Sequence, residues 1–400
     1  MSRISVIGLD GSPLSAAAEE ALKRAEVVAG GGRHLEAAGV GQERAAVLEG
    51  DLSGAMSRLE KASSAAVLAS GDPGYFGIVR SLAERFGSES LEVSPAVSSV
   101  ALAFARAGIP WDDAVTVSAH GRDPRRAVNV CRAYPKVAVL TSPGFGPEQL
   151  AESLRGEGWE RTLVVAERLG GAEERVFRGA PENVAAMEWG EPNVVISLDE
   201  KREVGGKPWI SGPERAAGWA LSEEEFEHRS SMITRPEPRA LALARLAPRP
   251  GDLVWDVGAG SGSVAVECAR LGSAAIAVER EPESCERVRR NAYRHGAYVR
   301  VVEGEAPGAL GGLPEPDAVF IGGTGGGFEK TIELCASRAR RAVVLTLIGL
   351  ERVVPAGEIL ESYGFEVETT LLQTSKVRGV GHLHRLAAET PVFVVAGSRA

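Results

Sequence analysis

Cysteine and aromatic residues are scarce in this sequence, with four cysteines among 400 residues and an aromatic share of 5%. Cys131, Cys268, Cys285 and Cys335 stand singly, without the spacing of a zinc site or a disulfide framework, so we expect packed, inert thiols and no bound metal. No apolar run approaches the roughly 18 residues that cross a bilayer. The strand-like start at residues 3–9 leaves no room for a signal peptide, and we expect a soluble, cytoplasmic protein without membrane contact.

Positive charge is also in short supply. Lys and Arg number 45 against 54 Asp and Glu, which gives a net charge of −9. This balance disfavours a surface that coats RNA or DNA and favours a small-molecule substrate. A chain of 400 residues exceeds one ordinary core, so we expect two α/β domains, each with a site.

The most informative stretch lies in the C-terminal half. An apolar run typical of a buried strand is followed by Gly258-Ala259-Gly260-Ser261-Gly262, a tight turn, and then by a helical pattern. A second apolar run ends at Glu279, about twenty residues beyond the glycines, where a βαβ unit holds a carboxylate against ribose hydroxyls. The sequence therefore predicts an adenosine site. The alternative is a glycine turn that only closes a tight βα corner.

The residues around this turn separate two kinds of adenosine site. The dinucleotide fingerprint has its third glycine where Ser263 stands. The GxGxG pattern found here, with Asp256 two residues before it, resembles the S-adenosylmethionine loop of Rossmann-like methyltransferases.

Apolar strands of the N-terminal half also end in glycine-rich turns. Residues 65–69 lead into Ser70-Gly71-Asp72-Pro73-Gly74, which by composition alone is a surface turn. Its place at the carboxyl end of a parallel-type strand favours a ligand loop instead. Further on, Ser98-Ser99 open a helix whose free amides can face a ligand. His120 follows another strand and is more often a structural histidine than a catalytic one.

Several segments of this half resemble the tetrapyrrole methylase family over residues 4–198, namely VIGLDG, LASGDPGYFG, SPAVSSVALAFARAGIPWDDAVTVSAHGR and VVAERLGGAEERVFRG. The resemblance implies a two-lobed α/β fold with S-adenosylmethionine in a cleft between the lobes. It implies cofactor contacts at Gly8, at Gly71-Asp72 and at Ser98-Ser99. The first turn departs from the family's usual GxGPG because Asp10 stands in it, and we expect a changed turn there.

The other half resembles the precorrin methyltransferases of the cobalamin pathway over residues 221–395, in EFEHRSSMITRPEPRALAL, VWDVGAGSGSVAVECAR, VVEGEAPGAL and DAVFIGGTGGG. Its seven predicted strands fit a Rossmann-like S-adenosylmethionine methyltransferase sheet closed by an antiparallel hairpin. The resemblance implies that Thr234 and Gly258 to Gly262 contact the cofactor, Glu279 the ribose, and Glu305-Ala306 the adenine region. Residues 345–349 depart from the family pattern.

A charged stretch rich in glycine and proline, residues 199–218, separates the two resemblances and is predicted to be a linker. We place the boundary near residue 212, which gives a tetrapyrrole methylase domain of residues 1–212 and a Rossmann-like domain of 213–400.

Together the halves resemble bifunctional enzymes that methylate precorrin-6B (precorrin-6Y) at C-5 and C-15 and decarboxylate the ring C acetate, giving precorrin-8. The resemblance implies one S-adenosyl-L-methionine per domain. It implies C-5 methylation in the N-terminal half, and C-15 methylation and decarboxylation in the C-terminal half. It also implies a homo-oligomer, either a dimer or a tetramer. It does not distinguish a metal-free from a cobalt-containing substrate. No catalytic residue is predicted.

A tetrapyrrole substrate carries many carboxylates, so a substrate cleft should be basic although the chain is acidic. Arg378, His382 and Arg385 lie in an acid-free run between Glu368 and Glu389 and are predicted to bind these carboxylates. The alternative is a solvated basic loop.

Two other functions stay open. An RNA methyltransferase is disfavoured by the acidic balance and by the lack of an Asn/Asp-Pro-Pro-aromatic motif after the fourth strand of the C-terminal half. A non-catalytic cofactor-binding protein with two degenerate folds is compatible with Asp10 and with the altered region around Thr346.

Overall fold

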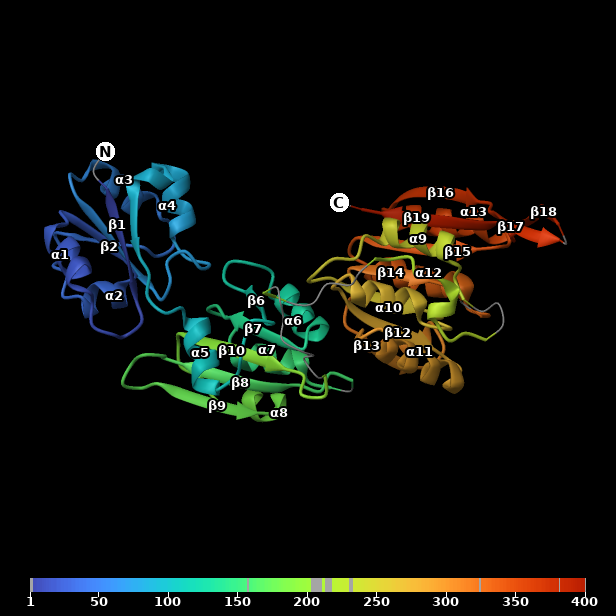
Figure 1. The fold of residues 1–400 in the computed structure, drawn as a ribbon, viewed down its shortest axis with the longest axis horizontal. Coiled ribbons are helices and arrows are strands. Elements are labelled where there is room, and N and C mark those ends of the chain that lie inside the picture. Colours follow the sequence, from blue (N-terminus) through green and yellow to red (C-terminus); the bar gives the residue numbers. More distant parts are fainter. Residues whose placement is uncertain are drawn as a thin grey trace. The chain divides into compact units, whose positions relative to one another are not determined.

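The computed structural model describes residues 3–156, 158–202, 211–212, 218–229, 233–323, 325–380 and 382–399. The chain forms two compact units, which are coloured along the sequence in Figure 1. The first comprises Met1–Arg122, Ala138–Glu152 and Arg161–Leu198, and the second Asp123–Val137, Ser153–Glu160 and Asp199–Ala400. Most of the predicted linker lies outside the described residues.

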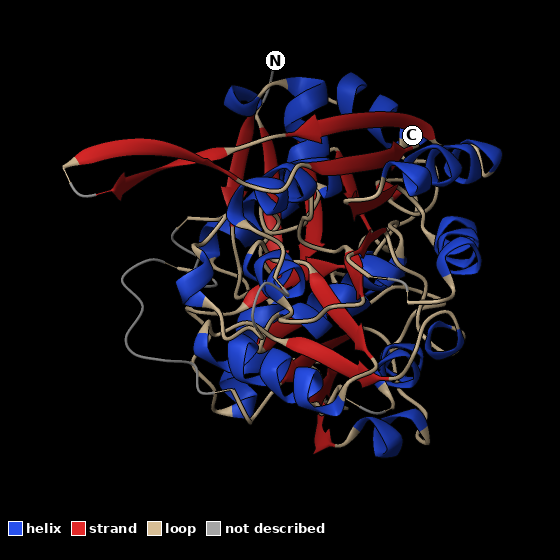
Figure 2. Ribbon diagram, turned by 90° about the vertical axis from the view of Figure 1, so that its right-hand side faces the viewer, coloured by secondary structure: helices blue, strands red, loops and turns tan. Residues whose placement is uncertain are grey.

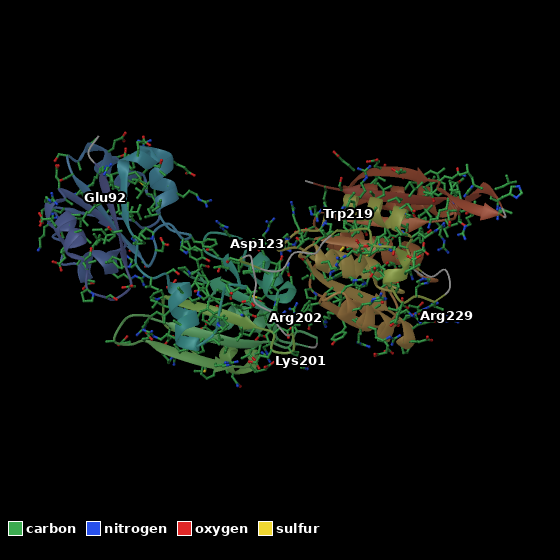
Figure 3. All side chains as sticks on the ribbon, viewed as in Figure 1. Glu92, Asp123, Lys201, Arg202, Trp219 and Arg229 are labelled. Carbon is green, nitrogen blue, oxygen red and sulfur yellow. The ribbon has the colours of Figure 1, made fainter. Side chains whose placement is uncertain are left out.

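The first unit begins with a five-stranded sheet in the order β3-β2-β4-β1-β5, and the neighbouring strands are parallel. Its strands are β1 (Ile4–Leu9), β2 (Val27–Gly30), β3 (Ala45–Val47), β4 (Ala65–Ser70) and β5 (Leu91–Ser94). Helices α1 (Ala16–Arg24), α2 (Gly32–Ala37), α3 (Ser53–Lys61) and α4 (Val79–Phe86) cover its two faces. The central strands are apolar on both sides because helices bury both faces of the sheet. Edge strand β5 instead exposes Glu92 (Figure 3).

A second sheet has the order β6-β7-β10-β8-β9, and β8 runs antiparallel to both of its neighbours. Its strands are β6 (Val115–Ser118), β7 (Lys136–Leu140), β8 (Thr162–Glu167), β9 (Arg175–Gly179) and β10 (Asn193–Leu198). The helices of this part of the chain are α5 (Ser99–Ala107), α6 (Pro124–Ala133), α7 (Pro147–Leu154) and α8 (Pro181–Ala185). These antiparallel pairs distinguish this sheet from the parallel first sheet.

The second unit is built on a seven-stranded sheet in the order β13-β12-β11-β14-β15-β19-β16. Its strands are β11 (Leu253–Val257), β12 (Ala274–Glu279), β13 (Val299–Glu303), β14 (Ala318–Ile321), β15 (Ala342–Leu347), β16 (Glu366–Leu372) and β19 (Val392–Ser398). Its helices are α9 (Pro236–Leu246), α10 (Ser263–Arg270), α11 (Pro282–Arg294), α12 (Phe328–Arg338) and α13 (Val353–Ser362). The predicted seven strands and the closing antiparallel pair are confirmed.

Short 3-10 turns and one hairpin complete the fold. The turns span Ser88–Ser90, Glu223–Glu225, Gly308–Leu310 and Leu350–Arg352. The hairpin consists of β17 (Ser375–Val380) and β18 (Leu383–Ala388), which pair only with each other among the described strands.

Helix α6 belongs to the second unit although it precedes the predicted boundary by many residues. Arg125 donates to the Asp317 carboxylate (2.8 Å), and Asn129 donates to the carbonyl of Gly251 (3.1 Å). Both acceptors lie just before a strand of the seven-stranded sheet. These contacts fasten α6 at the amino ends of β11 and β14.

In the part of the chain that is described, no helix is long and apolar enough to cross a membrane.

Candidate functional site

The carboxyl ends of β1, β4 and β5 meet backbone to backbone in the first unit. A Cβ atom on Gly8 would lie 2.1 Å from the carbonyl oxygen of Gly71 and 2.5 Å from the amide nitrogen of Ala96. Gly71 has φ +57° and donates its amide to the carbonyl of Leu9 (2.6 Å). Only glycine fits at these two positions, so the connections form a surface of main-chain groups at the ligand edge of the sheet.

The predicted side chains of these connections hold the loops in shape. Asp72 accepts the amide of Gly74 on Oδ1 (2.8 Å), and Ser98 caps α5 by accepting the amide of Ala101 on Oγ (3.1 Å). Helix α5 then begins at Ser99, and the first amides of a helix have no acceptor within it. An adenosine bound here would be held by backbone amides and carbonyls.

The first turn departs from the family pattern at Asp10. The Asp10 side chain makes hydrogen bonds within the loops. Its carboxylate accepts the amides of Ser12 (2.9 Å) and Val97 (3.1 Å). The bond from the Ser12 amide is the main cause that lowers the pKa of Asp10. Asp10 therefore links the β1 and β5 connections through hydrogen bonds.

The glycine loop of the second unit, Gly258 to Gly262, packs closely against the segment after β14 and against α11. Gly258 has φ +71°, and a Cβ there would lie 2.2 Å from the carbonyl oxygen of Gly323, after β14. Gly262 has φ +72°, and a Cβ there would lie 2.6 Å from Cγ1 of Val288 on α11. The amide of Ala259 donates to the carbonyl of Val278 (3.2 Å). The loop between β11 and α10 therefore needs its glycines.

Glu279 lies at the end of β12, as predicted, and reaches this loop. Its carboxylate accepts the amide of Gly260 (2.8 Å) on one oxygen and those of Arg280 (2.9 Å) and Glu281 (3.1 Å) on the other. Ser261 is buried, and its carbonyl accepts Nδ2 of Asn291 (2.8 Å). Acid and loop thus form one hydrogen-bonded surface of the kind that holds a ribose.

Asp256 lies beneath the loop and is 1% exposed. Its Oδ2 accepts the amide of Ala265 in the first turn of α10 (2.9 Å). Burial, reinforced by the charge of Glu279, raises the pKa of Asp256 to about 7. This buried carboxyl supports the loop from below.

Two further segments were predicted to contact the cofactor, Glu305-Ala306 and Thr234. Glu305 follows β13 and pairs with Arg280 (3.2 Å), and the amide of Gly304 donates to the carbonyl of Glu279 (2.9 Å). The segment predicted to contact adenine therefore adjoins the carboxylate predicted to contact ribose. Ala306 packs against the sheet core. Thr234 precedes α9, and its carbonyl accepts Nη1 of Arg239 (2.6 Å).

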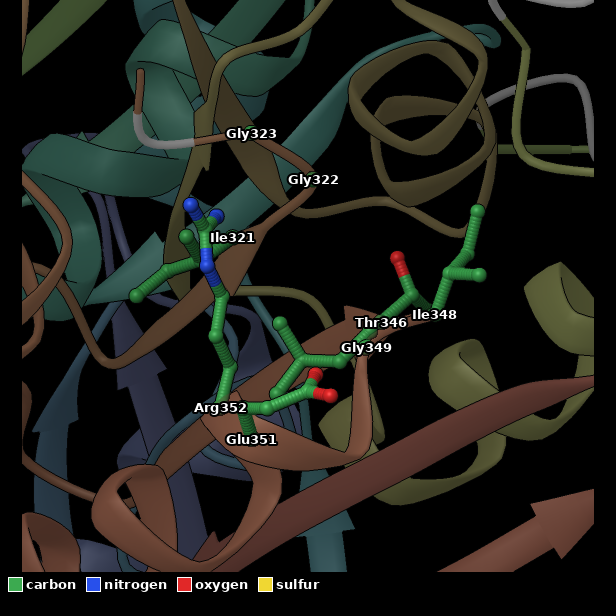
Figure 4. A pocket seen from close by; sticks show the side chains of 9 residues that line it. Ile321, Gly322, Gly323, Thr346, Ile348, Gly349, Glu351 and Arg352 are labelled. Carbon is green, nitrogen blue, oxygen red and sulfur yellow. The ribbon is translucent and has the colours of Figure 1, made fainter. Parts of the chain in front are cut away.

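A cavity of about 410 Å³ opens at the carboxyl ends of β14 and β15 (Figure 4). Its lining includes Gly322, Gly323 and Thr346, so the residues that depart from the family pattern face it. Arg352 reaches along the cavity wall toward Ile321, and its guanidinium carbon lies 5.1 Å from the ring centre of Phe328. Arg352 was not among the predicted site residues, and the one available signal in the sequence was its position shortly after the end of a buried parallel strand.

The predicted substrate residues lie on the β17–β18 hairpin, which extends from its unit as a two-stranded arm (Figure 2). Arg378 pairs directly across the strands with Arg385, both are exposed, and exposed His382 lies at the tip. Leu347 of β15 and Leu371 of β16 both pair with Phe393, so the hairpin leaves the sheet at the edge where the parallel strands end. The arm therefore starts at the edge that carries the glycine loop.

The four cysteines were expected to be packed, inert thiols, and His120 to be a structural residue. All four cysteine side chains are buried, and burial raises the pKa of Cys335 to about 12. His120 is exposed in the turn after β6. Among the described residues, no group of three or more His, Cys, Asp or Glu side chains could hold a metal ion.

Two family models match this chain. Residues 7–194 match the tetrapyrrole (corrin/porphyrin) methylases, and residues 224–398 match the precorrin methyltransferase domain. A precorrin-6Y C(5,15)-methyltransferase [decarboxylating] from Sinorhizobium is 38% identical over 380 residues, which cover 88% of this chain and 86% of the relative. The chain belongs to the precorrin-6Y C5,15-methyltransferase family.

Shorter relatives of this methyltransferase correspond to parts of the chain. A probable cobalt-precorrin-6B C(15)-methyltransferase (decarboxylating) from Pyrobaculum calidifontis is 32% identical, covering 44% of this chain and 93% of its own length. A cobalt-precorrin-7 C(5)-methyltransferase from Salmonella typhimurium is 34% identical, covering 47% and 93%. A solved precorrin-6Y C5,15-methyltransferase structure from Geobacter metallireducens is 32% identical over 45% of this chain and 96% of its own, with a TM-score of 0.43.

The methyltransferase fold brings together most of the residues expected to hold its cofactor. Gly8, Gly71-Asp72 and Ser98-Ser99 converge at one edge of the first sheet. Gly258 to Gly262, Glu279 and Glu305 converge at one edge of the seven-stranded sheet. The hairpin residues Arg378, His382 and Arg385 have no described contact with either group.

Proposed function

We propose that this methyltransferase uses S-adenosyl-L-methionine to methylate precorrin-6Y at C-5 and C-15, and removes carbon dioxide from the ring C acetate. The observation that carries the proposal is that two different sheets of one chain each have a glycine-lined strand edge, at Gly8 and at Gly258, that can hold a ligand. A relative over most of the chain is named for two methylations and a decarboxylation. The alternative substrate is a cobalt-containing precorrin. The names of the shorter relatives, which include cobalt-precorrins, support this alternative.

We assign C-5 methylation to residues 1–212 and C-15 methylation with decarboxylation to residues 213–400. The support is that the chain has shorter relatives named for each methylation separately, each similar over less than half of it. One chain that holds both sites keeps the intermediate near the second site at a raised effective concentration.

Each half is proposed to hold one S-adenosyl-L-methionine. The fit rests on the backbone cradles that a Cβ would fill at Gly8 and Gly258, and on the Glu279 carboxylate beside the loop. The cofactor supplies an electrophilic methyl group on a sulfonium. The chain's own task is alignment: main-chain groups fix the cofactor, and the substrate's electron-rich ring carbon must be held in line with the methyl group.

In the C-terminal half we propose that Arg378, His382 and Arg385 bind substrate carboxylates. Like charges directly opposite each other across two strands repel, and Arg378 and Arg385 occupy such a pair. A carboxylate between them removes the repulsion and suits the planar guanidinium forks. Arg352, at the cavity wall, is a further cation for the acetate that is lost.

We also propose a cytoplasmic homo-oligomer, dimer or tetramer, that acts on a small molecule and not on nucleic acid. A two-stranded hairpin by itself is marginally stable in water, and β17–β18 exposes the cross-strand pair Val377 (65%) and Leu386 (71%). A second copy that covers these side chains stabilises the arm. Sedimentation of wild type and Leu386→Lys tests the assembly.

Mass spectrometry of the product tests the function. The full chain, incubated with S-adenosylmethionine and precorrin-6Y, should yield a product that has gained two methyl groups and lost one carbon dioxide. Parallel reactions with the cobalt-containing precursor and with bulk RNA distinguish the alternatives. Methylation of RNA alone, or no methylation of any of the three, would reject the proposal.

A further inference from the structure

The carboxyl edge of the first sheet carries a polar cluster beside the residues predicted to hold the cofactor. Arg33 and His34 lie in the first turn of α2, just after β2, and Ser70 is the last residue of β4. Arg33 Nη2 donates to Ser70 Oγ (2.7 Å), Ser70 Oγ lies 3.0 Å from His34 Nε2, and Arg33 Nε donates to His34 Nε2 (3.3 Å). The three side chains close a ring of hydrogen bonds.

Arg33 is an exposed cation held by neutral groups. Burial, and then the charge of Arg33, lower the pKa of His34, so its imidazole is uncharged at neutral pH. In the described part of the chain no Asp or Glu forms an ion pair with Arg33, and its Nη1 makes no hydrogen bond. On a chain of net charge −9, such a guanidinium is a site prepared for an external anion.

The cluster adjoins the proposed cofactor loop. Ser70 precedes Gly71 directly, and β4 lies between β2 and β1 in the sheet. Gly8 and Ser98 lie against Gly71 on the side of the loop that faces β1 and β5. The Arg33 cluster lies on the other side of the loop, toward β2. A molecule that reaches the methyl donor at this edge can therefore place an acidic substituent against Arg33.

We propose that Arg33, Ser70 and His34 form a carboxylate subsite for an acetate or propionate group of the tetrapyrrole at the N-terminal methylation site. This inference rests on the proposed function. Arg33 engages the carboxylate with its planar fork, and Ser70 Oγ, which accepts Arg33 Nη2 and donates to His34 Nε2, holds the guanidinium in place. His34 is a positioning residue: its Nε2 acceptor keeps the guanidinium at the strand ends.

Steady-state C-5 methylation of precorrin-6Y by the full chain tests the subsite. Arg33→Ala should raise the KM for precorrin-6Y roughly tenfold to a hundredfold, the loss expected for a charged hydrogen-bonded contact. The kcat and the Kd for S-adenosylmethionine should not move. Arg33→Lys keeps the charge without the fork and should recover part of the loss. Arg3→Ala is the matched control, because Arg3 is exposed at the amino edge of the same sheet.

Equilibrium titration of precorrin-6Y into each variant, with S-adenosylhomocysteine present, separates the subsite from the reaction. Weaker binding by Arg33→Ala than by Arg3→Ala, at an unchanged melting temperature, supports the subsite even where the wild type does not methylate C-5. That last outcome would reject the proposed function alone. Equal binding and equal KM for Arg33→Ala, Arg3→Ala and wild type would overturn the subsite.

Discussion

At the scale of single residues, glycine decides what this chain can bind. A Cβ at Gly8 or Gly258 would lie 2.1 or 2.2 Å from a carbonyl oxygen, which is too close for non-bonded atoms. At Gly71 the backbone has φ +57°, and a Cβ would lie 3.0 Å from Cα of Ser98. These positions were predictable because only glycine allows such turns, and the requirement is local in the sequence. The contact between Arg33 and Ser70 was not, because 37 residues separate the two and only the parallel pairing of β2 with β4 joins them.

Asp256 offers a pH-dependent test at this scale. Its pKa is raised from 3.8 to about 7 by burial, so the native state holds a proton that the unfolded state releases. Stability from this group is fully present below about pH 4 and is lost as the pH rises to about 7. The total is on the order of 4 kcal/mol.

Asp256→Asn removes this dependence and keeps an oxygen that accepts the Ala265 amide. We expect the variant to gain stability relative to wild type as the pH rises from about 5 to about 8, measured by urea unfolding at each pH. A difference between the two proteins that stays constant over this range would show that Asp256 is ionised in the folded protein.

At the scale of elements, a buried ion pair ties the segment before α9 to the Rossmann core. Arg239 of α9 and Glu267 of α10 are both fully buried and lie 2.7 Å apart. Glu267 also accepts the amides of Ala220 and Leu221, while Arg239 donates to the carbonyls of Leu221 and Thr234. Both side chains of the pair are thus used to fix backbone that leads to a predicted cofactor contact.

Arg239→Met should cost about 3–5 kcal/mol, because it leaves the Glu267 charge buried without a cation. It should also weaken S-adenosylmethionine binding at the C-terminal site, since the Thr234 carbonyl loses its donor. Arg245→Met is the control on the same helix: its ion pair with Glu368 is exposed and worth at most about 1 kcal/mol. Urea unfolding and calorimetric titration measure both effects, and equal costs for the two variants would contradict the assignment.

The hairpin tests the substrate proposal for the C-terminal half. If Arg378 pairs a substrate carboxylate, Arg378→Ala should raise the KM for C-15 methylation and leave cofactor affinity unchanged. The fall in kcat/KM should correspond to a loss of roughly 1.5–3 kcal/mol of transition-state binding. Arg378→Lys should rescue only part of the loss. A solvated arm predicts instead that all three proteins have the same KM, because exposed charges contribute little.

Among the elements, the strands that were predicted correctly were those with clear apolar runs. Each of the seven strands of the second unit's main sheet was predicted from its apolar run. Strand β3 was missed because its three residues, Ala45–Val47, are too short and too weakly apolar to form a pattern. The cavity at Thr346 was not predictable, since it depends on how the connections after β14 and β15 pack against each other.

At the scale of the whole molecule, the question is whether both halves bind cofactor. Each glycine-walled edge is complete within its own compact unit, so the two sites should bind independently. Calorimetric titration of the full chain should give one S-adenosylmethionine for each half. Gly71→Val introduces a β-branched side chain at φ +57°, 3.0 Å from Cα of Ser98, and should remove the N-terminal site alone.

Gly260→Val, at φ +55°, should remove the C-terminal site alone, and the double variant should bind no cofactor. Gly54→Val is the matched control, because a Cβ there meets no atom within 4 Å. Product analysis then links site to reaction: Gly71→Val should still methylate C-15 and decarboxylate, while Gly260→Val should still methylate C-5. A wild type that binds a single equivalent, or a single variant that loses both methylations while it still binds one cofactor, would contradict the division of the chain into two independent active sites.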